Sequence, residues 1–362
     1  MADVSASRPS ATPRSEGVCI KRLYKVFGEH PNKVMPLVHQ GIGKDELRDK
    51  HGHILGLRDI HLDIAAGGIQ VIMGLSGSGK STLIRHINRL IDPSEGEVWI
   101  GGKDVVQMNH WALRRFRREH TAMVFQKFAL FPHMTILENV QYGLRVRGVK
   151  RRLRQEAAAR WIDRVGLAGY EDSFPNQLSG GMQQRVGLAR ALSNDAPILL
   201  MDEAFSALDP LIRSDMQRVL LELQQELAKT IVFITHDLDE ALRLGDQVAI
   251  LRDGEIIQQG TGQHIVLSPA NDYISSFTKD VNRGRVIRCQ TLMTPGVGVD
   301  GPSVEASLVI EEAARLLGAA GKEAANVCNS QGKLLGNITL SDIIGAMVPT
   351  KAQAPSPDSN NG

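Results

Sequence analysis

The chain has 362 residues, more than one average domain, so its length predicts two domains, one large and one small. A hydrophobic fraction of 42% with 23% charged residues excludes a wholly disordered or collagen-like chain. The formal net charge of only +2 argues against a protein that binds nucleic acid through bulk charge.

Cysteine usage and apolar runs narrow the class further. The three cysteines are far apart and form no C-x-x-C pair, which argues against a disulfide framework or a thiolate zinc site and favours a reducing compartment. The sequence has no run of 18 apolar residues, and its first 17 residues lack the apolar core of a signal peptide. We therefore expect a chain that neither spans a membrane nor is exported by that route.

The N-terminal third predicts a strand, an insertion and a second strand. Residues 1–17 are rich in Ser, Ala and Pro and are expected to be a disordered tail. Residues 18–27 predict a strand, and residues 68–73 predict another that leads into a Gly/Ser-rich turn and a helix. Between the strands, residues 28–55 form a polar insertion with a short helix expected over residues 44–50.

The middle of the chain alternates helical and strand patterns. Apolar residues recur at helical spacing over residues 151–165 and 211–228. Two short apolar runs without polar alternation, residues 198–201 and 231–235, predict parallel strands buried on both faces.

The C-terminal part predicts a second domain. Polar and charged residues interrupt the pattern around 277–285, so we expect one domain over residues 18–280 and another over 286–347. The second domain has the pattern strand, helix, strand, strand, helix. Residues 348–362 are expected to form a second disordered tail.

The strongest chemical signal is the segment Gly74 to Ser81, which matches G-x-x-x-x-G-K-[ST] between a predicted strand and a predicted helix. Its glycines allow backbone N–H groups to surround a phosphate, and the helix adds its positive dipole end. Lys80 supplies a point charge, and Ser81 supplies a hydroxyl ligand for Mg²⁺. The segment predicts a binding loop for a nucleoside triphosphate.

Two further segments fit phosphate chemistry. The apolar run that ends in Asp202 and Glu203 suits a carboxylate partner for Mg²⁺ followed by a general base. The segment LSGGMQQ, residues 178–184, places a Ser hydroxyl and a Gly pair at a helix start, which suits either phosphate binding or simple helix capping.

Together these three segments resemble the signature set of the ATP-binding cassette ATPases, over about residues 18–265. The resemblance implies an α/β P-loop cassette with a parallel-sheet core, an antiparallel β subdomain and a helical subdomain. It also places Gln126 beside Mg²⁺ and the attacking water, and it makes His236 the switch histidine. Phe27 is expected to stack on adenine, with a role as a plain core residue as the alternative.

The expected site residues fall into three sets. For ATP they are Phe27, Gly74, Ser76, Gly77, Ser78, Gly79, Lys80, Ser81, Thr82, Ser179, Gly180, Gly181 and Asp209. For Mg²⁺ they are Ser81, Gln126 and Asp202, and for catalysis Glu203, His236 and Gln126.

The resemblance further implies a dimer. In the family each ATP lies between the phosphate loop of one copy and the signature Ser of another, and this chain has one of each. We therefore expect two copies to associate head to tail, with ATP between them.

Three classes of cassette ATPase compete: an importer subunit with a separate permease, a soluble protein of DNA repair or translation, and an exporter. The absence of an apolar run argues against a fused exporter. Only about 100 residues separate Ser81 from Leu178, too few for the coiled coil of repair proteins, and translation proteins resemble two cassettes in tandem.

Local runs are similar to the quaternary-amine importers of glycine betaine and proline: residues 128–135, residues 202–213, residues 277–284 and the insertion after Phe27. This resemblance implies a peripheral ATPase at the cytoplasmic face of a bacterial plasma membrane, partnered by permease subunits and indirectly by a substrate-binding protein. An importer ATPase for another small solute stays an alternative.

The C-terminal segment carries TLMTPG from Thr291 and GKLLGNITLSDIIGAM from Gly332, which look like one CBS unit. Such units usually work in pairs, and only one fits into residues 286–347, so pairing would occur between subunits. A structural appendage without a ligand is the alternative reading.

Overall fold

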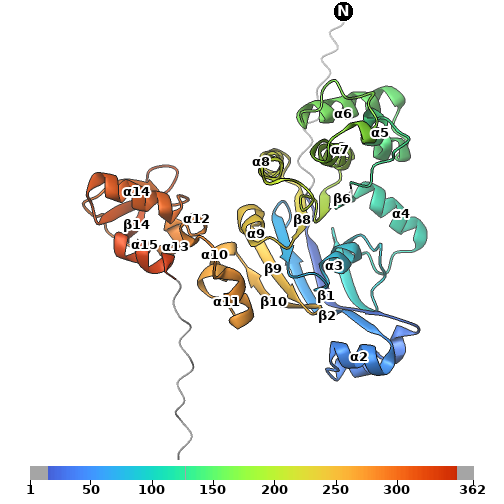
Figure 1. Ribbon diagram of the computed structural model, residues 1–362, viewed down its shortest axis with the longest axis horizontal. Coiled ribbons are helices and arrows are strands. Elements are labelled where there is room, and N and C mark those ends of the chain that lie inside the picture. Colours follow the sequence, from blue (N-terminus) through green and yellow to red (C-terminus); the bar gives the residue numbers. More distant parts are fainter. Residues whose placement is uncertain (1–14, 127, 349–362) are drawn as a thin grey trace, which may run out of the picture. The chain divides into compact units, whose positions relative to one another are not determined.

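A computed structural model describes residues 15–126 and 128–348 (Figure 1). The chain divides into two compact units, residues 1–259 and residues 260–362. Among the described residues, no helix combines the length and the apolar character needed to cross a lipid bilayer. The expected tails lie outside the described residues except at their inner ends, residues 15–17 and 348.

The first unit contains a four-stranded sheet in the order β2-β1-β4-β5. Its strands are β1 (Val18–Phe27), β2 (Ile54–Ile64), β4 (Glu95–Ile100) and β5 (Lys103–Asp104). All three neighbouring pairs in this sheet are antiparallel. The strand predicted over residues 18–27 is confirmed, because β1 has those bounds.

A six-stranded sheet in the order β10-β9-β3-β8-β7-β6 forms the second layer. Its strands are β3 (Ile69–Met73), β6 (Thr121–Phe125), β7 (Ile198–Asp202), β8 (Thr230–Thr235), β9 (Gln247–Arg252) and β10 (Glu255–Gly260). The central pairs β9/β3, β3/β8, β8/β7 and β7/β6 are all parallel. Strands β3, β7 and β8 are buried along their whole length, so the prediction of buried parallel strands is confirmed.

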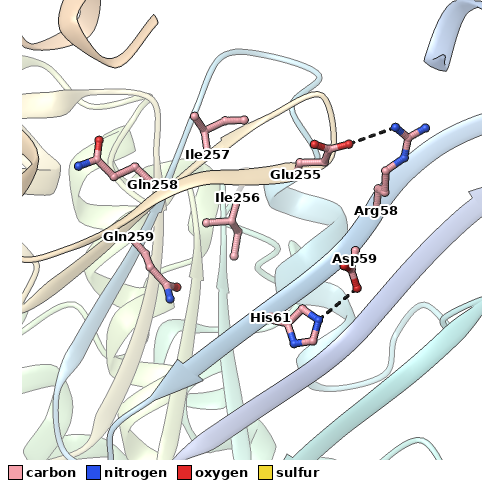
Figure 2. Close-up of a pocket in the computed structure, with 8 residues that line it drawn as sticks. All are labelled: Arg58, Asp59, His61, Glu255, Ile256, Ile257, Gln258 and Gln259. Carbon is pink, nitrogen blue, oxygen red and sulfur yellow. Dashed lines mark hydrogen bonds and ion pairs between the residues drawn. The ribbon is translucent and has the colours of Figure 1, made fainter. Parts of the chain in front are cut away.

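The two sheets are joined at one edge by an ion pair. Arg58 of β2 lies 3.2 Å from the Glu255 carboxylate of β10 (Figure 2). The backbone N–H of Arg58 also donates to the carbonyl oxygen of Gly254, at 2.8 Å. The turn between β9 and β10 is therefore attached to β2.

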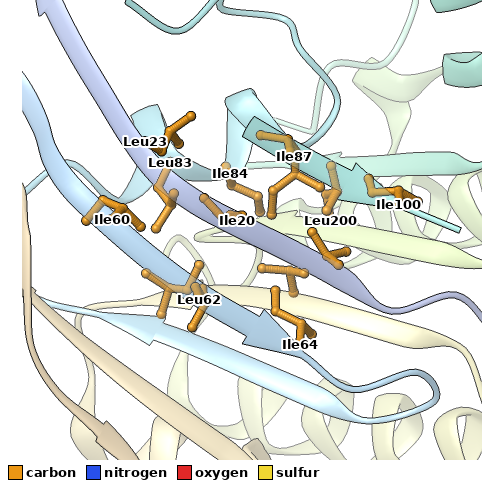
Figure 3. Close-up of a cluster of buried hydrophobic side chains, with 14 of the residues drawn as sticks. Ile20, Leu23, Ile60, Leu62, Ile64, Leu83, Ile84, Ile87, Ile100 and Leu200 are labelled. Carbon is orange, nitrogen blue, oxygen red and sulfur yellow. The ribbon is translucent and has the colours of Figure 1, made fainter. Parts of the chain in front are cut away.

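The main core lies between the two sheets and surrounds helix α3 (Lys80–Ile87) (Figure 3). Leu83, Ile84 and Ile87 of this helix are fully buried against Ile20 and other residues of β1, β2 and β4 on one side and Leu200 of β7 on the other. At about 25 cal/mol per Å² of apolar surface, each such side chain contributes roughly 2 kcal/mol to folding. The core thus fixes the helix that follows the phosphate loop.

Helices α5, α6 and α7 form a separate group with its own core (Figure 1). The three helices are α5 (Ile136–Val146), α6 (Arg151–Arg164) and α7 (Gly180–Ser193). Residues from all three, among them Val140, Ile162 and Val186, are fully buried together. The helix predicted over residues 151–165 is confirmed by α6.

Other helical segments of the unit connect these elements: α4 (His110–Glu119), the 3-10 turn η2 (Pro175–Gln177), α8 (Pro210–Leu227) and α9 (Leu238–Leu244). Among them, α4 contacts β6, and α9 contacts β3 and β8. Helix α8 confirms the helix predicted over residues 211–228.

The insertion at residues 28–55 folds against the end of β1. It contains η1 (Pro31–Lys33), α1 (Met35–His39) and α2 (Lys44–His51), of which α2 was predicted. Its small core contains Val34, Met35, Val38 and Leu47, packed with residues of β1 and β2. The insertion is thus an ordered part of the first unit.

The second unit contains helices around a sheet in the order β11-β14-β13-β12. Its elements are α10 (Gly262–Leu267), α11 (Asp272–Thr278), α12 (Arg283–Val286), α13 (Cys289–Leu292), β11 (Thr294–Pro295), β12 (Ser303–Glu305), α14 (Ile310–Ala320), β13 (Ala324–Cys328), β14 (Leu334–Thr339) and α15 (Leu340–Met347). From β12 to α15, the order strand, helix, strand, strand, helix matches the predicted pattern.

Two details differ from the sequence-based expectation. The division falls after Gln259 instead of within residues 281–285, because α10 packs with the second unit: the Gln263 side chain accepts from the N–H of Arg288 at 3.0 Å. At the N-terminus, residues 15–17 are ordered, since the Glu16 carboxylate binds His120 at 2.8 Å.

Candidate nucleotide site

The loop from Gly74 to Gly79 connects β3 to α3, which confirms the predicted strand, loop and helix. Gly74, Gly77 and Gly79 have φ angles of +154°, +77° and +105°. A Cβ atom on Gly74 would lie 2.2 Å from the carbonyl oxygen of Leu251, so no side chain fits there. The glycines therefore permit a tight loop that ends at the helix N-terminus, where backbone N–H groups are free for an anion.

Lys80 is a buried cation inside this loop, with a side chain only 4% exposed. Its Nζ donates to the carbonyl oxygens of Gly74, at 2.8 Å, and Leu75, at 3.0 Å. Burial lowers the pKa of Lys80, whereas the nearby carboxylates of Glu203 and Asp202 oppose that shift. The loop thus places one fixed positive charge beside the space that it surrounds.

Asp202, the last residue of β7, lies beside the start of α3. Its Oδ1 accepts from the Ser81 hydroxyl at 2.7 Å, and its Oδ2 lies 3.2 Å from the Arg85 guanidinium. Carboxylate and hydroxyl oxygens are ligands that Mg²⁺ prefers. The predicted metal pair, Ser81 and Asp202, is therefore together in the fold.

Glu203 follows Asp202 in the left-handed region, with φ +47°. Its Oε2 accepts from Nε2 of Gln126 at 3.1 Å and lies 3.7 Å from Nδ1 of His236. Its Oε1 lies 3.8 Å from Nζ of Lys80. The structure therefore gathers the three expected catalytic residues around one carboxylate.

A cleft of about 440 Å³ opens beside these groups. It is lined by Phe27, Lys44, Ile54, Leu55, Gly56, Ser76, Gly77, Gly79, Lys80, Ser81, Thr82, Gln126 and Glu203. Phe27, at the end of β1, is 37% exposed, which rules out the alternative that it is a core residue. The cleft has an aromatic and aliphatic end and a phosphate-loop end, which suits a molecule with a ring and an anionic chain.

Six expected ATP contacts do not line this cleft. Gly74 and Ser78 are buried within the phosphate loop, and the other four, Ser179, Gly180, Gly181 and Asp209, lie outside that loop. Ser179 caps α7 by accepting from the N–H of Met182, at 3.4 Å, and Asp209 caps α8 by accepting from Ile212, at 3.1 Å. Both residues are exposed. Within one chain, the LSGGMQQ segment and the phosphate loop are thus not parts of one cleft.

Sequence reasoning missed the contribution of the insertion and β2 to the cleft. Lys44, Ile54, Leu55 and Gly56 all line it, and no motif marks them. The Phe27 ring occupies the place where a Cβ of Gly56 would lie, 2.7 Å from ring atom Cε2. The pairing of β1 with β2 could have supplied one signal: Gly56 lies two residues beyond Ile54, the partner of Phe27, and leaves room for the Phe27 ring.

A second hollow, of about 470 Å³, lies at the β2/β10 edge that Figure 2 shows. Its lining includes Arg58, Asp59, His61 and Glu255 and none of the expected site residues. Among the residues described, no three His, Cys, Asp or Glu side chains group as a metal site. A cation bound at Ser81 and Asp202 would therefore need oxygen ligands from a bound phosphate as well.

The fold and this site define a class: a P-loop ATPase of the cassette type. The ABC transporter family model matches residues 57–206. The "Glycine betaine transport ATP-binding protein OpuAA" of Bacillus subtilis is 48% identical over 326 residues, covering 89% of this chain and 76% of that protein. The "Glycine betaine/proline betaine transport system ATP-binding protein ProV" of Escherichia coli is 50% identical, covering 77% and 72%.

Among solved structures, a dimeric post-hydrolysis state of the ATP-binding cassette MJ0796, bound to ADP and Pi, is 33% identical with a TM-score of 0.58. The match covers 67% of this chain and 98% of that one. The chain belongs to the ABC transporter family of ATP-binding proteins, and its activity is ATP hydrolysis.

Proposed function

We propose that the chain powers the import of a quaternary amine, such as glycine betaine or proline betaine, through separate permease subunits. The observation that carries the proposal is the cleft in which Lys80, Glu203 and Gln126 meet. The amino-acid sequence is about 50% identical to those of glycine betaine transport ATP-binding proteins. Docking to the permease would hold the protein at the cytoplasmic face of the membrane, with a substrate-binding protein as an indirect partner.

In this proposal, Phe27 stacks on the adenine of ATP, and residues 74–82 surround the phosphates. Lys80, already fixed by two loop carbonyls, neutralises the β- and γ-phosphate oxygens. The side chains of Ser81, Gln126 and Asp202 supply oxygen ligands that fit Mg²⁺, which when bound would neutralise charge on the phosphates.

Hydrolysis needs a water molecule in line with the bond between the γ-phosphorus and the bridging oxygen. Glu203 is the general base that polarises this water, because its carboxylate lies 3.8 Å from Lys80, accepts a hydrogen bond from Gln126 and lies 3.7 Å from His236. Gln126 and His236 orient the carboxylate and the water. The products are ADP and inorganic phosphate.

The site is completed by a second copy of the chain. Ser179, Gly180, Gly181 and Asp209 are exposed or near the surface and lie outside the cleft of their own chain, so in a head-to-tail dimer they are free to contact the ATP of the partner. The solved relative MJ0796 is itself a dimer. ATP then acts as the link between two copies, and its hydrolysis releases them.

The second unit is proposed to contain one CBS-like module over residues 286–347. Its β12–α14–β13–β14–α15 order supports that reading. Apolar side chains of its helices are exposed, with Leu316 at 47% and Ile344 at 54%, which suits pairing with the same module of the partner. The module would regulate transport, since the expected phosphate-handling residues all lie in the first unit.

The test is reconstitution with a quaternary-amine permease and its substrate-binding protein, followed by uptake of labelled solutes into liposomes. Wild-type protein with internal ATP should drive uptake of glycine betaine or proline betaine, and the Glu203→Gln variant should reduce the rate at least 100-fold. Choline, carnitine and methionine serve as comparison solutes. Uptake of methionine but of no quaternary amine would contradict the proposed substrate.

A further inference from the structure

Besides Lys80, a second lysine reaches the nucleotide cleft from a part of the chain without any motif. Lys44, the first residue of α2, donates from Nζ to the carbonyl oxygen of Gly77 at 3.3 Å. Gly77 is in the middle of the phosphate loop, 33 residues further along the chain. Lys44 also lines the same cleft as Phe27 and Lys80. The insertion therefore brings a cation to the mouth of the site.

The surrounding contacts hold α2 in this position. Leu47 of the same helix is fully buried in the small core of the insertion, together with Val38 and Leu55. The Arg58 guanidinium donates to the carbonyl oxygen of Ile42, two residues before Lys44, and is itself paired with Glu255 (Figure 2). Lys44 therefore sits on a supported helix, and its position does not depend on a loose surface loop.

The charge of Lys44 is only weakly compensated. The one acidic side chain within 4 Å, among the described residues, is Asp253, whose Oδ1 lies 3.8 Å away and which is 67% exposed. The Lys44 side chain is 34% exposed, and its closer partner is a neutral carbonyl. Ion pairs at 3.8 Å near a protein surface are weak, so a phosphate oxygen can replace Asp253 or the Gly77 carbonyl as the partner of Lys44.

We propose that Lys44 binds the polyphosphate of the nucleotide and that the insertion is therefore a part of the ATP site. This inference rests on the proposed nucleotide site and adds to it a contact from residues 28–55. Lys44 lines the same cleft as Phe27, and its ammonium group lies at Gly77 of the phosphate loop, within reach of a phosphate bound there. Lys80 remains the cation of the loop interior.

The experiment compares equilibrium binding of ATP, ADP and adenosine to the full-length protein and five variants. Lys44→Gln should weaken ATP and ADP about five- to tenfold at low salt and leave adenosine unchanged, because only phosphates carry the charge that Lys44 meets. The difference should shrink at 0.5 M salt, where screening is strong. Lys44→Arg should keep most of the affinity.

Two matched variants serve as controls. Lys50→Gln removes a lysine from the same helix that is paired with Glu46 at 2.7 Å, and it should bind all three ligands as wild type does. Asp253→Asn removes the competing carboxylate and should leave ATP affinity equal or higher.

The outcomes separate this inference from the proposed function. Unchanged ATP affinity in Lys44→Gln, or an equal loss for ATP and adenosine, would overturn the phosphate contact, since the second result is that of altered packing. Lys80→Ala is measured beside it: if that variant also kept full ATP affinity, the proposed nucleotide site itself would fail.

Discussion

At the residue scale, His86 shows how the helix after the phosphate loop depends on pH. The side chain is buried on α3, and its Nδ1 donates to the carbonyl oxygen of Thr82 at 2.7 Å. Its Nε2 is buried without a hydrogen-bond partner. Burial disfavours the charged imidazolium and lowers the pKa of His86 from 6.5 to about 4, although the backbone hydrogen bond to Thr82 opposes part of that shift.

The sign of the effect follows from this lowered pKa. Above pH 6.5 the imidazole is neutral in both states, whereas between pH 6.5 and 4 the unfolded chain binds a proton that the folded chain does not. The free energy of unfolding should therefore decrease by about 3 kcal/mol between pH 7 and pH 4 because of this residue. His86→Gln should remove that part of the slope in denaturant titrations. Parallel pH profiles of wild type and variant would contradict the assignment.

Most of the residues that meet at the phosphate loop could be predicted from the sequence. The spacing of Gly74 to Ser81 and the carboxylates after a buried strand were sufficient, because each motif is fixed by a strand that ends at the same edge of a parallel sheet. Lys44 was not predictable in this way. Its contact with Gly77 depends on the tertiary position of α2, and the local sequence has no phosphate-binding pattern.

At the element scale, elements with a clear apolar pattern could be predicted, whereas the shortest helices, such as α1, could not. Strand β1 and helix α8 follow clear apolar periods. Helix α1 has only five residues, and it forms because Met35 and Val38 pack in the small core with Leu47. Propensity alone does not favour such a short helix in water.

Local sequence patterns were also insufficient to place the boundary between the two units. The charged stretch around residues 277–285 resembles a linker, yet Thr278 is 1% exposed and a Cβ on Gly284 would lie 2.7 Å from Cε of Met347. The charges lie on the outer sides of short packed helices, and Arg285 pairs with Glu311 at 3.0 Å.

This boundary predicts how two truncations differ. A chain ending at Gly260 should keep its ATPase activity within about twofold, because β10 is complete and the cleft residues all precede it. A chain ending at Arg285 keeps Leu267 but loses the core of the second unit against which Leu267 packs, so it should aggregate at lower temperature. Thermal unfolding and ATP turnover of both chains test this.

If the CBS-like module is regulatory, the shorter chain should also differ from the full chain in how uptake depends on internal ionic strength. Superimposable uptake curves would leave the module as a structural appendage. Loss of ATPase activity in the Gly260 truncation, with activity retained in the Arg285 truncation, would instead place α10 and α11 with the ATPase unit.

At the scale of the whole molecule, the proposed head-to-tail dimer requires each chain to contain halves of two different ATP sites. The cleft contains the phosphate loop and Glu203, whereas Ser179 at the start of α7 is exposed and lies outside it. A second copy is then required before ATP meets both sets of residues. In the proposed dimer, differential contact with ATP in the associated and separated states would convert hydrolysis into movement.

The most direct measurement is the mass of the Glu203→Gln variant by light scattering during size exclusion, with and without ATP and Mg²⁺. Slow hydrolysis should let ATP persist, so that the mass doubles only when ATP is present. Adding Ser179→Arg places a large charged side chain at an exposed helix start, and this double variant should still bind ATP yet stay monomeric. A Glu203→Gln protein that stays monomeric with bound ATP, or a double variant that dimerises as well as the single one, would contradict the head-to-tail site.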